Sequence, residues 1–130
     1  MPRQATPYRN GELVVVIDCS DLGRSARFWC DVLGYVARSS SEGGHYRTLL
    51  PADGQGIEVL LQRVDDAKLG KNRVHLDLRT PDLVAEAGRV RGLGASQLTA
   101  DPLLEDGLRW HIFADPDGNE FCVLQLIQPG

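Results

Sequence analysis

The sequence predicts an α+β protein made of two tandem βαβββ modules with mixed sheets. The prediction rests on an internal repeat. Residues 20–34, SDLGRSARFWCDVLG, parallel residues 81–94, PDLVAEAGRVRGLG, at an offset of 61 residues at the start and 60 at the end. Strand-like segments flank both copies, and no linker-like or low-complexity stretch separates them. We therefore expect one domain over residues 1–130, with module one at about 12–64 and module two at about 72–128.

In the first module, a short β-branched run at Leu13–Cys19 predicts a buried strand. A helix is expected over residues 20–34, because apolar residues recur at helical spacing between a capping Ser20 or Asp21 and a terminating Gly34. Turns that contain Gly, Pro and Asp separate three further strands. These strands are expected at Tyr35–Arg38, Tyr46–Leu50 and Ile57–Val64.

The second module repeats this plan. Apolar and polar residues alternate over Val74–Arg79, which predicts a strand, and the helix of Pro81–Gly94 follows it. Further strands are expected at Ala95–Thr99, Leu108–Ala114 and Glu120–Ile127, the last two joined by the hairpin turn DPDGN. We interpret residues 100–107 as a loop, which could serve as a lid, a dimer contact or ordinary packing.

Composition excludes several classes of function. The chain has 130 residues with a net charge of -4, so it lacks the basic excess that nucleic-acid binding needs. Its uninterrupted apolar runs, such as Leu13–Ile17, are far shorter than the roughly 20 residues of a membrane span. Three cysteines without CxxC spacing indicate reduced thiols rather than a disulfide framework. We therefore expect a cytoplasmic protein with neither nucleic acid nor membrane as a partner.

The helix segment SDLGRSARFWCDVLGY, together with RVHLDLRTPDL and FADPDGNEFCVL, resembles the vicinal oxygen chelate superfamily. This superfamily includes glyoxalase I, extradiol dioxygenases, and the fosfomycin and bleomycin resistance proteins. The resemblance covers Leu13–Ile127 and is strongest to the small glyoxalase-like proteins. It implies that the curved mixed sheets of the two modules surround a cavity. It does not choose among the many chemistries that this fold carries.

The resemblance also implies where a metal would bind. Metal enzymes of the superfamily carry ligands on the first and last strand of each module, which correspond here to Val14, Glu58, His75 and Cys122. Glu58 and His75 match the glyoxalase pattern of His, Glu, His and Glu, whereas Val14 cannot bind a metal and Cys122 departs from the pattern. Because catalytic metal sites generally use at least three protein ligands, we expect no metal. The alternative is a divalent ion on Glu58 and His75, with Cys122 as a soft third ligand suited to zinc.

Aromatic and polar residues on the predicted strands are candidates for ligand binding. Along Leu108–Ala114, Trp110 and Ile112 share one face and His111 and Phe113 the other, so either pair could line a cavity. For Asp77, a salt bridge to Arg79 or Arg109 is the favoured interpretation. The predicted ligand-binding set is Glu58, His75, Tyr46, Trp110, His111 and Cys122.

These observations favour a small-molecule-binding protein that sequesters a hydrophobic or aromatic ligand, such as an antibiotic, without a metal. We expect a homodimer, and the sequence leaves open whether the modules pair within one chain or across the dimer. The acidic side chains expected at the pocket favour a neutral or cationic ligand. The alternative is a glyoxalase-like enzyme, a lyase, isomerase or dioxygenase, that uses Glu58 and His75 with or without a divalent metal.

Overall fold

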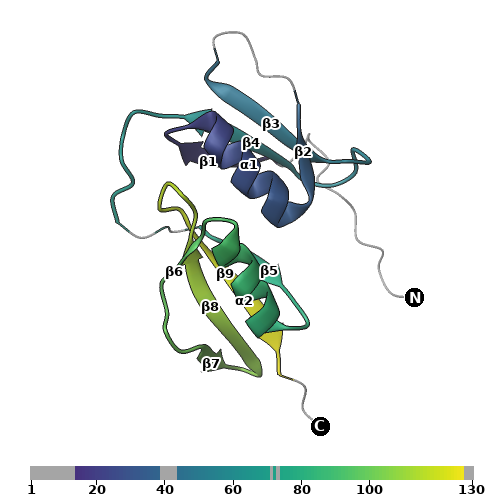
Figure 1. The fold of residues 1–130 in the computed structure, drawn as a ribbon, viewed down its shortest axis with the longest axis vertical. Helices are drawn as coiled ribbons and strands as arrows, with labels where there is room; N and C mark the ends of the chain where they lie inside the picture. Colours follow the sequence, from purple (N-terminus) through teal and green to yellow (C-terminus); the bar gives the residue numbers. More distant parts are fainter. Residues whose placement is uncertain (1–13, 39–43, 71, 73, 128–130) are drawn as a thin grey trace, which may run out of the picture.

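Each half of the chain folds into a β-sheet with one helix packed on one face (Figure 1). The computed structural model describes residues 14–38, 44–70, 72 and 74–127. Its two sheets form separate hydrogen-bonded ladders and do not close into a barrel. This arrangement confirms the predicted α+β class with mixed sheets.

The first sheet has four strands in the order β1-β4-β3-β2. Strands β1 and β4 are parallel, with Val14 opposite Glu58, and the other two pairs are antiparallel. Its elements are β1 (Val14–Cys19), α1 (Leu22–Leu33), β2 (Tyr35–Ala37), β3 (Tyr46–Pro51) and β4 (Glu58–Arg63).

The second sheet repeats this order as β5-β9-β8-β6 and adds β7, which pairs with β8. Strand β5 runs parallel to β9, and the other pairs are antiparallel. Its elements are β5 (Leu76–Arg79), α2 (Leu83–Gly92), β6 (Ser96–Gln97), β7 (Leu103–Glu105), β8 (Leu108–Ala114) and β9 (Glu120–Leu126).

Strand β7 corrects the interpretation of residues 100–107 as a loop. It forms a hairpin with β8, with Glu105 opposite Leu108. Asp106 and Gly107 both adopt positive φ, at 52° and 76°. Two consecutive residues of this kind match the twist of a two-residue hairpin, which is why an Asp-Gly pair can close one here.

Helix α1 begins and ends where its capping residues predict. The Asp21 carboxylate accepts a hydrogen bond from the backbone N–H of Arg24 at 3.0 Å. This N–H holds the pKa of Asp21 below its ordinary value. Gly34 ends the helix at a φ of 72°, a left-handed conformation that glycine adopts without a Cβ clash.

The halves are joined where α1 meets the turn between β8 and β9. The buried Trp29 ring lies 5.1 Å from that of Phe121, and its indole N–H donates to Asp115 at 3.0 Å. Asn119 of the same turn donates from its side-chain amide to the Asp18 carbonyl at 2.8 Å. From α2, the Arg89 guanidinium donates to the carbonyl oxygens of residues 31 and 32 in α1. These contacts fix the turn of module two against module one.

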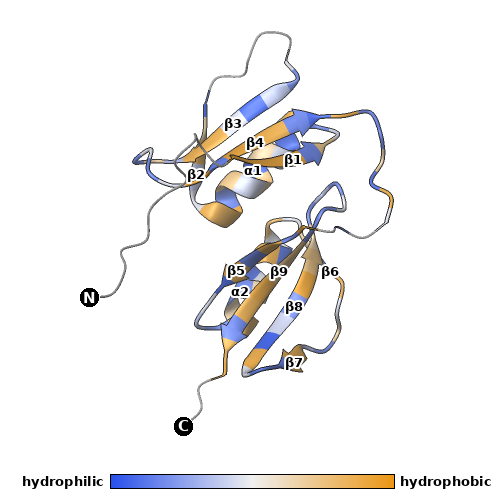
Figure 2. Ribbon diagram, turned by 180° about the vertical axis from the view of Figure 1, so that it is seen from behind, coloured by the Kyte–Doolittle hydropathy of each residue, from blue (hydrophilic) through white to orange (hydrophobic). Residues whose placement is uncertain are grey.

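The sheet faces opposite the helices are the ones available for function. In β1 and β4, Ile17 and Leu61 are buried in the core, whereas Val16, on the other face, is 52% exposed. Figure 2 shows hydrophilic and hydrophobic residues mixed along β8 and along the strands of the first sheet. In the part of the chain that the structure describes, no helix is long and apolar enough to cross a membrane.

Candidate functional site

A cavity of about 380 Å³ lies on the face of the second sheet that points away from α2. This volume is within the range of small-molecule sites, about 300–1,000 Å³. Its apolar lining comes from Leu103, Leu108, Trp110, Ile112, Phe121 and Leu124. Its polar lining comes from His75, Asp77, Glu105, Asp106, Glu120 and Cys122. We call this cavity the second-sheet pocket.

The pairing of β8 determines which aromatic residues reach the second-sheet pocket. Trp110 and Ile112 line it. His111 lies on the opposite face, is 9% exposed, and has its Nδ1 2.9 Å from the Thr99 hydroxyl. Its ring also packs edge to face against Phe113. The Trp110 face of β8 is therefore the one that can meet a ligand, and His111 belongs to the packing behind it.

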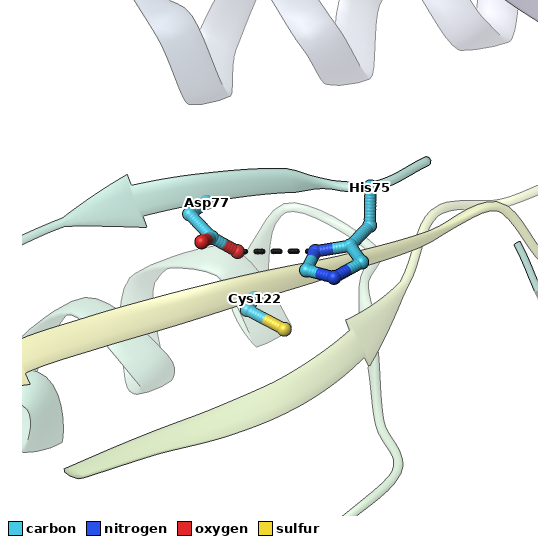
Figure 3. Close-up of side chains that lie close together, drawn as sticks. All are labelled: His75, Asp77 and Cys122. Atoms are coloured by element: carbon cyan, nitrogen blue, oxygen red, sulfur yellow. Dashed lines mark hydrogen bonds and ion pairs between the residues drawn. The ribbon is translucent and has the colours of Figure 1, made fainter. Parts of the chain in front are cut away.

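Three polar side chains gather at one wall of the second-sheet pocket (Figure 3). Asp77 of β5 lies directly opposite Cys122 of β9 in the parallel ladder. His75 precedes Asp77 by two residues, and its Nδ1 lies 3.2 Å from the Asp77 Oδ1. One ligand atom from each of the three lies within 4.8 Å of the others. An imidazole, a carboxylate and a thiol therefore share one small volume.

The contact between His75 and Asp77 corrects the expected salt bridge of Asp77 to an arginine. Asp77 pairs with His75, while the Arg109 guanidinium donates to the Gln125 side chain at 3.0 Å. Arg109 and Gln125 are opposite each other in the ladder of β8 and β9. They do not line the second-sheet pocket. The imidazole of His75, which lies just before β5, is thus the partner that the fold supplies to Asp77.

Glu58 and Tyr46 belong to the first sheet and do not line the second-sheet pocket. Glu58 lies opposite Val14, and Tyr46 lies opposite Gln62 with 40% of its surface exposed. Within the described chain, no hydrogen bond or ion pair joins Glu58 to His75. The six predicted residues therefore divide, with His75, Trp110 and Cys122 at the pocket, Glu58 and Tyr46 on the other sheet, and His111 behind the second sheet.

The ladder register identifies a residue that sequence reasoning missed. Val16 faces Leu60 in the first sheet, as Asp77 faces Cys122 in the second. Two residues earlier in the first ladder are Val14 and Glu58. Counting back two residues from Asp77 and Cys122 gives His75 and Glu120, which lie just before the first paired residues of β5 and β9. Glu120 is thus the counterpart of Glu58 in the repeat, and it lines the second-sheet pocket. Counting the repeat strand by strand, rather than from the helices, would have indicated it.

Comparison with known proteins gives a family and a fold. The sequence model of the glyoxalase-like domain family matches residues 14–124. No curated protein sequence matches the chain.

Several solved structures are similar. A hypothetical protein from S. aureus superposes with a TM-score of 0.71 at 16% identity, covering 91% of this chain and 95% of that one. A glyoxalase/bleomycin resistance protein/dioxygenase family enzyme from Burkholderia phytofirmans has a TM-score of 0.70 at 15% identity, with coverages of 87% and 96%. A mutant of the fosfomycin resistance protein FosX from Listeria monocytogenes, complexed with Mn(II) and a dihydroxypropylphosphonic acid, has a TM-score of 0.70 at 16% identity, with coverages of 92% and 91%. At these identities the likeness is one of fold.

Proposed function

This chain belongs to the glyoxalase-like domain family, and we propose that it binds and sequesters a small molecule in the second-sheet pocket. The family confirms the resemblance to the vicinal oxygen chelate superfamily. Because that fold carries many chemistries, the proposal depends on the pocket itself. The observation that carries it is the combination of an apolar wall around Trp110 with one polar wall at His75, Asp77 and Cys122.

The lining indicates what kind of molecule would bind. A planar or apolar body would lie against Trp110 and Ile112, because aromatic rings offer large contact areas to flat ligands. Among the residues described, the pocket is lined by the carboxylates of Asp77, Glu105, Asp106 and Glu120 and by no lysine or arginine. Such a lining favours a neutral or cationic molecule over an anion. Antibiotics with a flat apolar body belong to this class, as do other aromatic compounds.

A homodimer is part of the proposal. The open face of the first sheet exposes Val16, Val36 and Tyr46 at 52%, 44% and 40%. Burying these side chains against a second copy would remove apolar surface from water. Glu58 does not line the second-sheet pocket of its own chain, so a second copy packed on this face would be the means of bringing a pocket to it. Light scattering of the purified chain tests this part, and a monomer at micromolar concentration would contradict it.

A pair of fluorescent probes tests binding. We expect neutral N-phenylnaphthylamine to bind and quench Trp110, and its anionic relative anilinonaphthalene sulfonate to bind at least about tenfold more weakly, which is roughly 1.4 kcal/mol. Trp110→Ala should lower the affinity for the neutral probe by a similar factor. Val84→Ala, on the exposed side of α2, is the matched control. Equal affinities in the Trp110 and Val84 variants, measured with chelator present, would refute the proposal.

An acid–base enzyme is the second candidate, favoured by the 3.2 Å contact between His75 and Asp77. A carboxylate at Nδ1 orients an imidazole so that its other nitrogen can take a proton from a carbon next to a carbonyl. In this form of the alternative, Asp77 takes the orienting role expected of Glu58. Turnover of a hemithioacetal, a catechol or an acyl-CoA substrate, lost in His75→Gln, would replace the sequestration proposal.

A further inference from the structure

We propose that His75, Asp77 and Cys122 form a zinc site built from the second sheet alone. The expectation that no metal binds depended on the finding that two residues, Glu58 and His75, match the glyoxalase ligand pattern. The structure changes that count, because Asp77 and Cys122 stand beside His75 on two neighbouring strands. Three protein ligands are the number that catalytic zinc sites commonly use.

The distances suit a tetrahedral ion after small side-chain rotations. Zinc bonds of about 2.0–2.3 Å set the ligand atoms roughly 3.3–3.8 Å apart. The Nδ1 of His75 and Oδ1 of Asp77 are 3.2 Å apart, and each of the three residues offers one ligand atom within 4.8 Å of the others. The ladder fixes the backbone of Asp77 directly opposite Cys122. Closing the site therefore needs side-chain rotation and no strand shift.

The donor set selects the metal. A thiolate is a soft ligand that favours zinc over magnesium or manganese, and imidazole also suits zinc. The Asp77 carboxylate and the Cys122 thiolate together would neutralise the two positive charges of the ion. Glu105 and Glu120 line the same pocket and add negative potential that attracts a cation.

The ligand positions implied by the superfamily resemblance do not fit an ion in the described chain. Val14 offers no donor atom, and Glu58 lies opposite it in the first sheet, outside the second-sheet pocket. The inferred site therefore keeps His75 and Cys122 and takes Asp77 in place of both first-module positions. Three ligands leave a fourth position open toward the pocket, where a water or an oxygen of a bound molecule could coordinate. The side chains of His75 and Asp77 are 47% and 45% exposed, so an ion can enter from solvent.

Metal titration tests the site without any organic ligand. Full-length protein is stripped with chelator, and Zn²⁺ is added in competition with a chromophoric chelator. We expect one zinc per chain, and a loss of affinity of roughly 100-fold or more in His75→Gln, Asp77→Asn and Cys122→Ser, because each removes a direct ligand. Glu58→Gln and Cys30→Ser are matched controls and should bind as the wild type does. Circular dichroism shows whether each variant is folded.

Cobalt substitution identifies the thiolate directly. Co²⁺ bound at this site should give visible bands of tetrahedral geometry and a near-ultraviolet sulfur-to-metal charge-transfer band. Cys122→Ser should abolish the charge-transfer band, and the controls Glu58→Gln and Cys30→Ser should keep it. Absence of stoichiometric zinc, a bound cobalt without that band, or a Glu58→Gln loss equal to that of Asp77→Asn would overturn the inference.

Alkylation separates the zinc site from a nucleophilic cysteine. Zinc should protect Cys122 from iodoacetamide, as mapped by mass spectrometry. Burial raises the pKa of the Cys19 and Cys30 thiols, so both give a slow background. Rapid alkylation of Cys122 that zinc does not slow would mean that the three side chains activate a thiol rather than hold a metal. Because probe binding is measured with chelator and zinc binding without probe, failure of one proposal leaves the other intact.

Discussion

The two halves of the molecule share one plan and differ on the face that the helices leave open. In the first sheet, the three related ladder positions hold Val14, Val16 and Leu60. At the corresponding positions the second half has Asp77 opposite Cys122, and His75 two residues before Asp77, just ahead of β5. The first half thus has three apolar residues where the second has three metal-ligating types. The strand order is nevertheless the same, with β1-β4-β3-β2 in the first sheet matched by β5-β9-β8-β6 in the second.

The faces toward the helices are alike, and this likeness explains why the open faces can differ. Leu61 and Leu49 are fully buried in the first half, as Phe113 and Val123 are in the second. Burial of such residues supplies most of the driving force for folding, so it constrains one face of each sheet strongly. The opposite face contributes less to stability. It is therefore the face on which binding chemistry can vary between two copies of one module.

The two tryptophans test this division and give the largest expected effect. Trp29→Ala should lower the free energy of unfolding by about 3–5 kcal/mol, because the ring is 1% exposed and packs against Phe28 and Phe121. Trp110→Ala should cost less than half as much, since its ring borders the second-sheet pocket. Urea denaturation of both variants measures the difference. Equal losses would mean that the open face stabilises the fold as much as the core does.

A second test exchanges the residues that the two halves carry at these three corresponding positions. His75→Val, Asp77→Val and Cys122→Leu, combined in one protein, should reduce zinc affinity by roughly 100-fold or more while the protein stays folded. The reciprocal change, Val14→His with Val16→Asp and Leu60→Cys, should add a second zinc per chain. Elemental analysis after gel filtration measures both. If the reciprocal protein folds and still binds one zinc, the ladder positions are insufficient and the surrounding carboxylates are needed.

The sequence predicts those features of the fold that depend on neighbouring residues better than those that depend on long-range pairing. The bounds of α1 were predictable because Asp21 and Gly34 act on their immediate neighbours. The order of the elements along each half, a strand, a helix and then further strands, followed from the repeat. Strand β7 was not predicted because residues 100–107 were interpreted as a loop with two leucines among acidic residues. The Asp106–Gly107 pair that closes the hairpin is nevertheless a local signal.

The candidate site depended on a pairing that the sequence does not specify. His75 and Cys122 were named from the resemblance, but the neighbour of Cys122 is set by the register of β5 on β9. That register brings Asp77 to the thiol and leaves Glu58 in the other sheet. A one-residue slip would turn Asp77 to the opposite face. Long-range register, rather than residue type, is therefore what sequence reasoning lacked.

The smallest expected effect concerns the helices. Helix α2 has an ion pair within itself, between Glu86 and Arg89, whereas Arg24 of α1 pairs with Asp117 outside the helix. Glu86 accepts two hydrogen bonds from the Arg89 guanidinium, both at 2.7 Å, and these hold the pKa of Glu86 below its ordinary value of 4.5. A lowered folded pKa stabilises the protein at pH values above the unfolded pKa, and this stabilisation is lost as the pH falls through the folded pKa.

Glu86→Gln should therefore cost about 0.5–1 kcal/mol at pH 7, a value kept small because the pair is partly exposed to solvent. The cost should be smaller at pH 3 than at pH 7, because the stabilisation by this pair decreases once the pH falls below the unfolded pKa and is lost as it falls through the lowered folded pKa. Urea denaturation at the two pH values measures it. Arg89→Ala should cost more than Glu86→Gln at both, because it also removes the hydrogen bonds to the carbonyl oxygens of residues 31 and 32 that join α2 to α1. If the two variants lose equal stability, Arg89 acts within α2 alone and the contact between the halves depends on Trp29 and the turn after β8.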